Sequence, residues 1–217
     1  STLSSEIKKA FPACTKSHHI LPVGFNKDFL NIEHQENKKY DVIYSGNFSQ
    51  WKGLDILVEA ISIIRHQYNR DIKAVLIGAN DQTKQQYENQ AKELGVFDNI
   101  EIVKRVEHKK IYDYISQSKI GVLSNKYDAD GLLFTSPLKL YEYLGSGLKV
   151  VVSRLPSIES NIDQSLVYYA TPESPHSFAK EMLNALDDDT FDMNKIKEFS
   201  KNYTWESRSK SFMEFIL

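Results

Sequence analysis

The sequence lacks the features that mark several large classes of protein. Its 217 residues include a single cysteine, Cys14, so the chain cannot form an internal disulfide, and its composition suits a reducing compartment. No apolar run approaches the roughly 20 residues that a membrane-spanning helix requires, and no signal peptide is visible. We therefore expect a cytoplasmic protein.

An excess of charge of either sign is also missing. The chain has 27 lysine and arginine residues against 29 aspartate and glutamate residues, which gives a formal net charge of −2. No overall field steers such a protein onto nucleic acid or a membrane surface, so we expect no nucleic-acid partner. Any basic site must be local. Hydrophobic residues make up 41 % of the chain, which is enough for a packed core.

Short apolar runs alternate with helical patterns from residue 40 to residue 170. Runs that are apolar throughout are typical of parallel strands covered on both faces. The alternation predicts an α/β fold with a doubly wound parallel sheet of the Rossmann type, followed by C-terminal helices. The predicted strands are 40–45, 72–77, 100–103, 120–123, 148–152 and 166–170. The predicted helices are 54–68, 83–94, 109–117, 137–144, 175–186 and 191–200, with a closing helix that Thr204 caps.

Loops at one edge of such a sheet are the expected place for a ligand. Doubly wound folds bind ligands beyond the carboxyl ends of their strands, and four loops of this chain leave such ends. The first runs from Gly46 to Gly53, between a strand and a helix, where α/β proteins place phosphates. The other three are 78–81, 104–107 and 124–136.

The last of these loops leads into a short helix with an unusual charge. Ser136 suits the cap and Pro137 the first helical position. Lys139 then lies near the positive end of the helix dipole, a position that only a bound anion would make favourable. Glu142 lies about one turn deeper, so phosphate near Lys139 and ribose hydroxyls at Glu142 would suit a nucleotide. The alternative is an ordinary ion pair between Lys139 and Glu142 on a helix surface.

The residues of this segment resemble a known family. Ser-Pro-Leu-Lys-Leu-Tyr-Glu-Tyr at 136–143, with the glycines and the Val-Val-Val-Ser strand that follow, is similar to the donor-binding segment of retaining glycosyltransferases of the GT-B fold, family 4. In that family the second glutamate of a Glu-(seven residues)-Glu motif binds the nucleotide ribose, and Glu142 matches it. The first glutamate corresponds to Phe134. The resemblance then leaves Asp128 or Asp130 to hold the donor sugar.

The glycine-flanked loop extends the resemblance. The family has Gly-Arg-(four residues)-Lys-Gly at this point, and its arginine and lysine hold the donor diphosphate. This chain matches both glycines and the lysine, Lys52, but has Asn47 in place of the arginine. The missing charge would come from Arg105 or Lys126.

The resemblance implies a set of site residues. Lys52 and Glu142 would be the two catalytically important side chains, because Lys52 would stabilise the departing diphosphate and Glu142 would fix the ribose. The loop after the third strand would contact the nucleotide base. No metal and no cofactor would be needed besides the donor, a nucleotide-diphosphate sugar. The donor-binding residues would be Gly46, Asn47, Lys52, Arg105, Val106, Thr135, Ser136, Lys139 and Glu142.

The resemblance also implies domains and partners. GT-B enzymes bind the donor in a C-terminal domain and the acceptor in an N-terminal domain, so we expect a piece of a longer polypeptide. Residues 1–30 would end the N-terminal domain and connect it, 31–187 would form the donor domain, and 188–217 would pack back toward the N-terminal domain. A glycan or lipid-linked acceptor, a surface polysaccharide product and contact with the inner face of a membrane through the N-terminal domain are implied. The alternative is a non-catalytic module that binds a nucleotide or nucleotide sugar.

Two expectations concern other side chains. We expect Trp205, Phe212 and Phe215 of the closing helix to be core anchors. His108 precedes Lys109 and Lys110 at a helix start, and we expect it to be solvated rather than catalytic.

Overall fold

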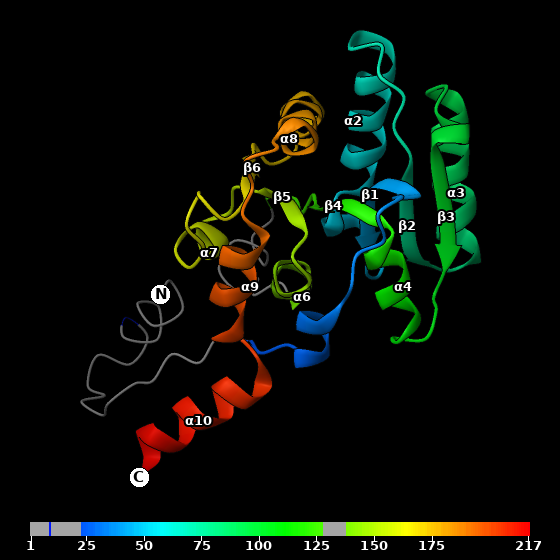
Figure 1. Cartoon of the computed structure of the whole chain (residues 1–217). Coiled ribbons are helices and arrows are strands. Elements are labelled where there is room, and N and C mark those ends of the chain that lie inside the picture. Colours follow the sequence, from blue (N-terminus) through cyan, green and yellow to red (C-terminus); the bar gives the residue numbers. More distant parts are fainter. Residues whose placement is uncertain (1–8, 10–22, 128–137) are drawn as a thin grey trace.

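A single parallel sheet forms the centre of the protein (Figure 1). The computed structural model describes residues 9, 23–127 and 138–217. Within these residues the sheet has six strands in the order β3-β2-β1-β4-β5-β6, and every neighbouring pair is parallel. The strand order reverses between β1 and β4, which is the point where doubly wound folds bind ligands. The strands are β1 Tyr40–Ser45, β2 Ala74–Ala79, β3 Ile100–Lys104, β4 Ser118–Leu123, β5 Lys149–Ser153 and β6 Tyr168–Ala170.

Helices cover both faces of the sheet, so the core has two halves. One face carries α2 Leu54–Gln67, α3 Asp81–Glu93 and α8 Pro175–Asp187. The other carries η1 Lys27–Asn31, α4 Lys110–Ser116, α6 Leu138–Ser146, α7 Pro156–Glu159 and α9 Met193–Lys201. The remaining elements are η2 Gln50–Lys52, η3 Phe97–Asn99 and α10 Trp205–Ile216. No helix of the described ranges is both long enough and apolar enough to cross a membrane.

The strands are apolar throughout because both of their faces are buried. In β1, Val42 and Tyr44 lie in the half of the core under α2, whereas Ile43 lies in the half under α6. The same alternation occurs in β2, where Leu76 and Ile77 belong to opposite halves. A strand with only one buried face would show polar residues at every second position.

Helix α6 packs closely against the sheet because glycines make room for it. A Cβ atom on Gly121 of β4 would lie 2.4 Å from the Tyr143 ring, and one on Gly145 would lie 2.4 Å from the Phe25 ring. Gly145 therefore lies inside the helix as a packing residue, and α6 continues two residues beyond the predicted end at 144. Gly147, with a positive φ of 86°, follows the last helical residue.

Helix α10 is attached at its first residues and extends away from the sheet (Figure 1). The backbone N–H groups of Phe25 and Trp205 donate to Tyr203 O and Phe25 O, both at 3.0 Å. Thr204 caps the helix as predicted, since its hydroxyl accepts from the Ser207 N–H. The prediction that the aromatic residues of α10 anchor the core is wrong. Trp205, Phe212 and Phe215 are 54 %, 46 % and 43 % exposed, and no residue of this helix is buried.

Candidate functional site

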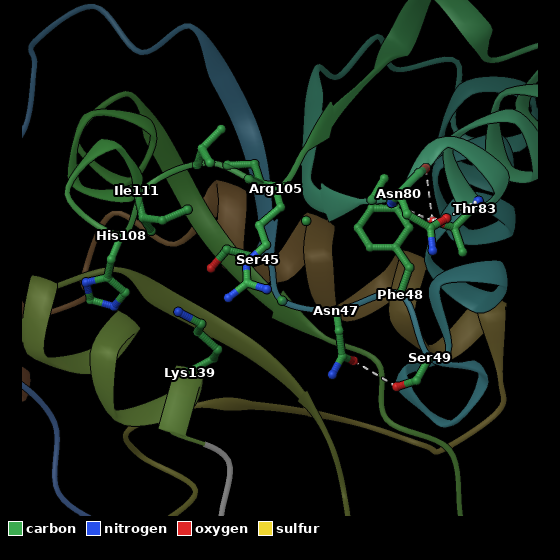
Figure 2. Close-up of a pocket in the computed structure, with 15 residues that line it drawn as sticks. Ser45, Asn47, Phe48, Ser49, Asn80, Thr83, Arg105, His108, Ile111 and Lys139 are labelled. Carbon is green, nitrogen blue, oxygen red and sulfur yellow. Dashed lines mark hydrogen bonds between the residues drawn. The ribbon is translucent and has the colours of Figure 1, made fainter.

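A cavity of about 840 Å³ lies at the carboxyl ends of β1, β2 and β3 (Figure 2). Its walls are the loops that leave these three strands and the first turn of α6. Five of the residues predicted to bind the donor line it. Arg105 and Lys139 reach into the same part of the cavity from different elements. The five lining residues are Gly46, Asn47, Arg105, Val106 and Lys139.

The loops after β1 and β2 meet backbone to backbone. Gly78 has a φ of 117°, and a Cβ atom on it would lie 2.0 Å from the carbonyl oxygen of Gly46. The Gly46 N–H donates to the Ile77 carbonyl at 2.9 Å. This close approach requires glycine at position 78 and fixes the rear wall of the cavity.

Asn47 takes part in holding its own loop. Its carbonyl oxygen accepts from the Tyr44 hydroxyl at 2.6 Å, and its side-chain oxygen accepts from the Ser49 hydroxyl at 2.8 Å. The amide nitrogen of the side chain has no partner within the described residues, so it can offer a hydrogen bond but no charge.

Lys52 lies beside the cavity rather than in its wall. Its Nζ is 3.7 Å from the centroid of the Trp51 ring, and its backbone carbonyl accepts from the Ser124 hydroxyl at 3.1 Å. Burial, and secondarily the nearby charge of Lys139, lower the pKa of Lys52 to about 8. Next in sequence, Gly53 has a φ of 63°, and a Cβ atom on it would lie 2.0 Å from Ser124 O. The loop is therefore held against the exit of β4.

The two cationic side chains predicted to compensate for Asn47, Arg105 and Lys126, lie in different surroundings. Lys126 forms an ion pair with Asp55, with Nζ 2.7 Å from the carboxylate oxygen, and does not line the cavity. Arg105 does line it and has no ion pair within the described residues. Of the two candidates, Arg105 is the one in position.

Glu142 is buried next to the cavity with two neighbours from different elements. It is only 2 % exposed, although it carries a carboxylate. Lys139 Nζ lies 2.6 Å from Oε2, and His108 Nε2 lies 3.6 Å from Oε1. The ion pair that was the alternative interpretation thus exists, but it lies at the buried edge of the cavity. Because Lys139 also lines the cavity, the pair remains close to any ligand there.

Tyr143 connects α6 to the last residue of β1 through a buried hydrogen bond. The Ser45 N–H donates to the Tyr143 hydroxyl at 2.7 Å, and the Ser45 Oγ lies 3.0 Å from the same oxygen. Burial raises the pKa of Tyr143, so the phenol stays neutral. The bond fixes the distance between the two elements that carry Glu142 and Asn47.

Tyr143→Phe should lower the free energy of unfolding by about 1–3 kcal/mol, because the buried Ser45 N–H would lose its partner. Urea denaturation measures this change. Tyr141→Phe is the matched control, since Tyr141 is a buried tyrosine of the same helix whose hydroxyl has no hydrogen bond within the described residues. Equal losses in the two variants would show that the Ser45 bond does not hold α6 in place.

Several cavity residues were not predicted, and others lie outside the described residues. Asn80 and Thr83 line the cavity and close a capping box at the start of α3, with bonds of 2.8 and 3.0 Å. An asparagine followed three residues later by threonine was the available signal. His108 was expected to be merely solvated, yet it lines the cavity and lies beside Glu142. The predicted residues outside the described ranges are Thr135, Ser136, Phe134, Asp128 and Asp130.

A metal site does not emerge from the described residues. No three His, Cys, Asp or Glu side chains among them gather as metal ligands would. The expectation that the reaction needs no metal stays a prediction.

The sequence matches the family model of the group 1 glycosyl transferases over residues 26–203. The chain belongs to this glycosyltransferase family. The family assignment made from the Ser136 segment and the Gly46 loop is therefore confirmed. No curated protein matches the sequence of this glycosyltransferase at a significant level.

Solved structures share the fold of this group 1 chain. Sucrose-phosphate synthase from Thermosynechococcus elongatus matches with a TM-score of 0.78 at 16 % identity, covering 100 % of this chain and 56 % of that one. Anabaena HepE in complex with UDP and glucose matches with a TM-score of 0.71 at 14 % identity, and the match covers 89 % of this chain and 55 % of that one. WaaG, a glycosyltransferase involved in lipopolysaccharide biosynthesis, matches with a TM-score of 0.70 at 16 % identity, and the match covers 96 % of this chain and 59 % of that one. The chain thus spans somewhat more than half of each protein, and the predicted doubly wound parallel sheet is confirmed.

Proposed function

We propose that this chain binds the donor of a retaining glycosyltransferase, and that the donor is a nucleotide-diphosphate sugar. One observation carries the proposal: cationic side chains and a buried carboxylate meet at the carboxyl edge of β1 to β3. A diphosphate and a ribose need these two kinds of group next to each other. The UDP and glucose present in the HepE structure fit the same class of ligand.

The diphosphate would lie between Lys52, Lys139 and Arg105. Lys52 and Arg105 have no ion pair within the described residues, so no described carboxylate neutralises their charges. Besides burial, the nearby charge of Lys139 lowers the pKa of Lys52, because the two positive charges repel each other. A ligand with two phosphates would relieve that repulsion. Fixed cations at this position would also stabilise the negative charge that develops on the leaving diphosphate.

The ribose would bind at Glu142, because its carboxylate can accept a hydrogen bond from a ribose hydroxyl. Lys139 holds the carboxylate through Oε2, and His108 lies beside Oε1. An acceptor glycan or lipid-linked sugar, an N-terminal domain of the same polypeptide and a surface polysaccharide product complete the proposal. Action in the cytoplasm at the inner face of a membrane also remains a prediction from the sequence and its family.

We infer that helix α10 packs back toward the N-terminal domain, as predicted for residues 188–217. That domain would cover the exposed apolar residues of the helix, which include Trp205, Phe212, Met213 and Ile216.

Thermal unfolding in the presence of UDP, GDP and ADP tests the proposal. A nucleotide at 100 times its dissociation constant should add about 2.7 kcal/mol to the stability of the folded chain. Transfer from the corresponding sugar nucleotides should then be measured with the full-length polypeptide. If none of the three nucleotides stabilises the chain, the donor assignment is wrong.

A non-catalytic nucleotide-binding module is the second candidate. The uncharged Asn47 favours it, because one charge contact to the diphosphate is missing from the loop after β1. Nucleotide binding without turnover of any sugar nucleotide by the full-length polypeptide would favour this candidate over the enzyme.

Glu142→Gln should weaken nucleoside-diphosphate binding about tenfold. The amide keeps the shape of the side chain, but its hydrogen bonding to ribose loses the contribution of the charge, about 1.4 kcal/mol. Calorimetric titration measures the effect. Glu101→Gln is the control, because Glu101 accepts from Tyr40 at 2.7 Å in a different cavity, and it should leave binding unchanged. Unaltered affinity in Glu142→Gln would show that the Glu142 carboxylate does not bind the ribose.

A further inference from the structure

We propose that His108 is a second ribose-binding residue, and that His108 and Glu142 bind one ribose hydroxyl between them. The inference rests on the proposed function and adds to it a residue and a direction of approach. His108 lines the cavity at the loop between β3 and α4, opposite the α6 face that carries Glu142. Figure 2 shows the imidazole at the edge of the cavity, next to Lys139.

The spacing of the two side chains suits a shared partner. His108 Nε2 and Glu142 Oε1 are 3.6 Å apart, which is too long for a direct hydrogen bond. A hydroxyl oxygen can lie about 2.8–2.9 Å from both atoms at once, since that triangle closes easily. It would donate its proton to the carboxylate and accept one from the ring N–H. A single hydroxyl therefore satisfies both groups, which neither can do for the other at this distance.

The other carboxylate oxygen is already occupied. Lys139 Nζ lies 2.6 Å from Oε2, so Oε1 is the oxygen left for a ligand. Glu142 is 3 % exposed in its side chain, whereas His108 is 54 % exposed. The carboxylate is thus almost fully buried, whereas the imidazole, with Nε2 3.6 Å from Oε1, is open to the cavity. A hydroxyl that reaches Oε1 from the cavity side would also lie within reach of His108.

Aromatic packing holds the imidazole in place for this role. The ring lies edge-on to Phe29 at 5.6 Å and to Tyr112 at 5.8 Å between centroids. Phe29 is fully buried, and its own ring packs against Tyr112 at 4.7 Å. Contacts of this kind restrict the ring without using its nitrogen atoms. The Nε2 atom therefore stays free to bind a ligand.

The test compares a ribonucleotide with its 2′,3′-dideoxy counterpart. The tightest binder of UDP, GDP and ADP is titrated, with its dideoxy form, into the wild type and into His108→Ala, His108→Gln and His66→Ala. His108→Ala should weaken ribonucleotide binding about fivefold and leave dideoxynucleotide binding unchanged. His108→Gln keeps an N–H donor and should recover part of the loss. His66→Ala, at an exposed histidine of α2, is the control and should bind like the wild type.

A coupling measurement strengthens the test. In Glu142→Gln the further change His108→Ala should cost less than it does alone, because the shared hydroxyl is already held more weakly. Equal loss for the ribonucleotide and its dideoxy form in His108→Ala and His108→Gln would overturn the inference and leave the proposed function standing. Failure of the wild type to bind any of the nucleotides would instead overturn the proposed function.

Discussion

Lys52→Ala is expected to weaken nucleoside-diphosphate binding about 100-fold. A charge-assisted hydrogen bond to phosphate contributes about 1.5–3 kcal/mol, and 2.7 kcal/mol corresponds to a factor of about 100. The upper part of this range applies because Lys52 is only partly exposed and its charge has no carboxylate partner within the described residues. Calorimetric titration at constant ionic strength measures the affinity.

Lys38→Ala is the matched control for this variant. Lys38 is also partly buried, and burial lowers its pKa to about 8, as for Lys52. Its Nζ donates to the Ser116 carbonyl at 2.8 Å, before the start of β4 and so at the opposite edge of the sheet. Its loss should change stability but not binding. If Lys52→Ala binds nucleoside diphosphates within twofold of the wild type while remaining folded, Lys52 has no role in holding the donor.

The affinity for nucleoside diphosphates should also fall as the pH rises above 8. The pKa of Lys52 is about 8 in the free protein, and a bound diphosphate would raise it by attraction. Above pH 8 binding must therefore take up a proton, and the affinity should fall about tenfold for each pH unit, or about 100-fold by pH 10. The phosphates themselves do not titrate in this range, because their last pKa lies near 6.

Lys52→Arg separates this effect from other titrations. Arginine keeps its charge throughout the range, so this variant should bind with little dependence on pH between 8 and 10. Titrations of both proteins at half-unit intervals provide the comparison. The same slope in Lys52→Arg as in the wild type would show that another group is responsible.

Much of the fold could be predicted because strands that are buried on both faces appear in the sequence as short runs of apolar residues. The strand at 40–45 was predicted without error, and the ends of the other strands and of most helices differ from the structure by two residues or fewer. Asn80 illustrates the limit. Its side chain accepts from the Thr83 N–H at 2.8 Å, so α3 begins at Asp81, two residues before the predicted start.

The candidate site was only partly predictable. Motif spacing identified Gly46 and Arg105 as lining residues of one cavity, because the carboxyl ends of parallel strands must meet. Spacing could not show that Lys126 is bound to Asp55, or that His108 lies beside Glu142, since each pair joins segments far apart in the sequence.

The exposed aromatic side chains of α10 show a different limit. A helix with one apolar face looks the same in sequence whether its own domain covers that face or leaves it bare. The positions of the aromatic residues in the closing helix therefore supported the prediction of an apolar face. They could not show whether the rest of the domain buries that face.

The pairing of Phe25 with the start of α10 has a mechanical consequence. Two backbone bonds join the chain that enters the sheet to the chain that leaves it, and a Cβ atom on Gly24 would lie 2.6 Å from the Trp205 ring. These bonds fix the direction in which α10 leaves the domain relative to Phe25. Any side chain larger than that of glycine at position 24 would collide with the Trp205 ring and weaken this attachment.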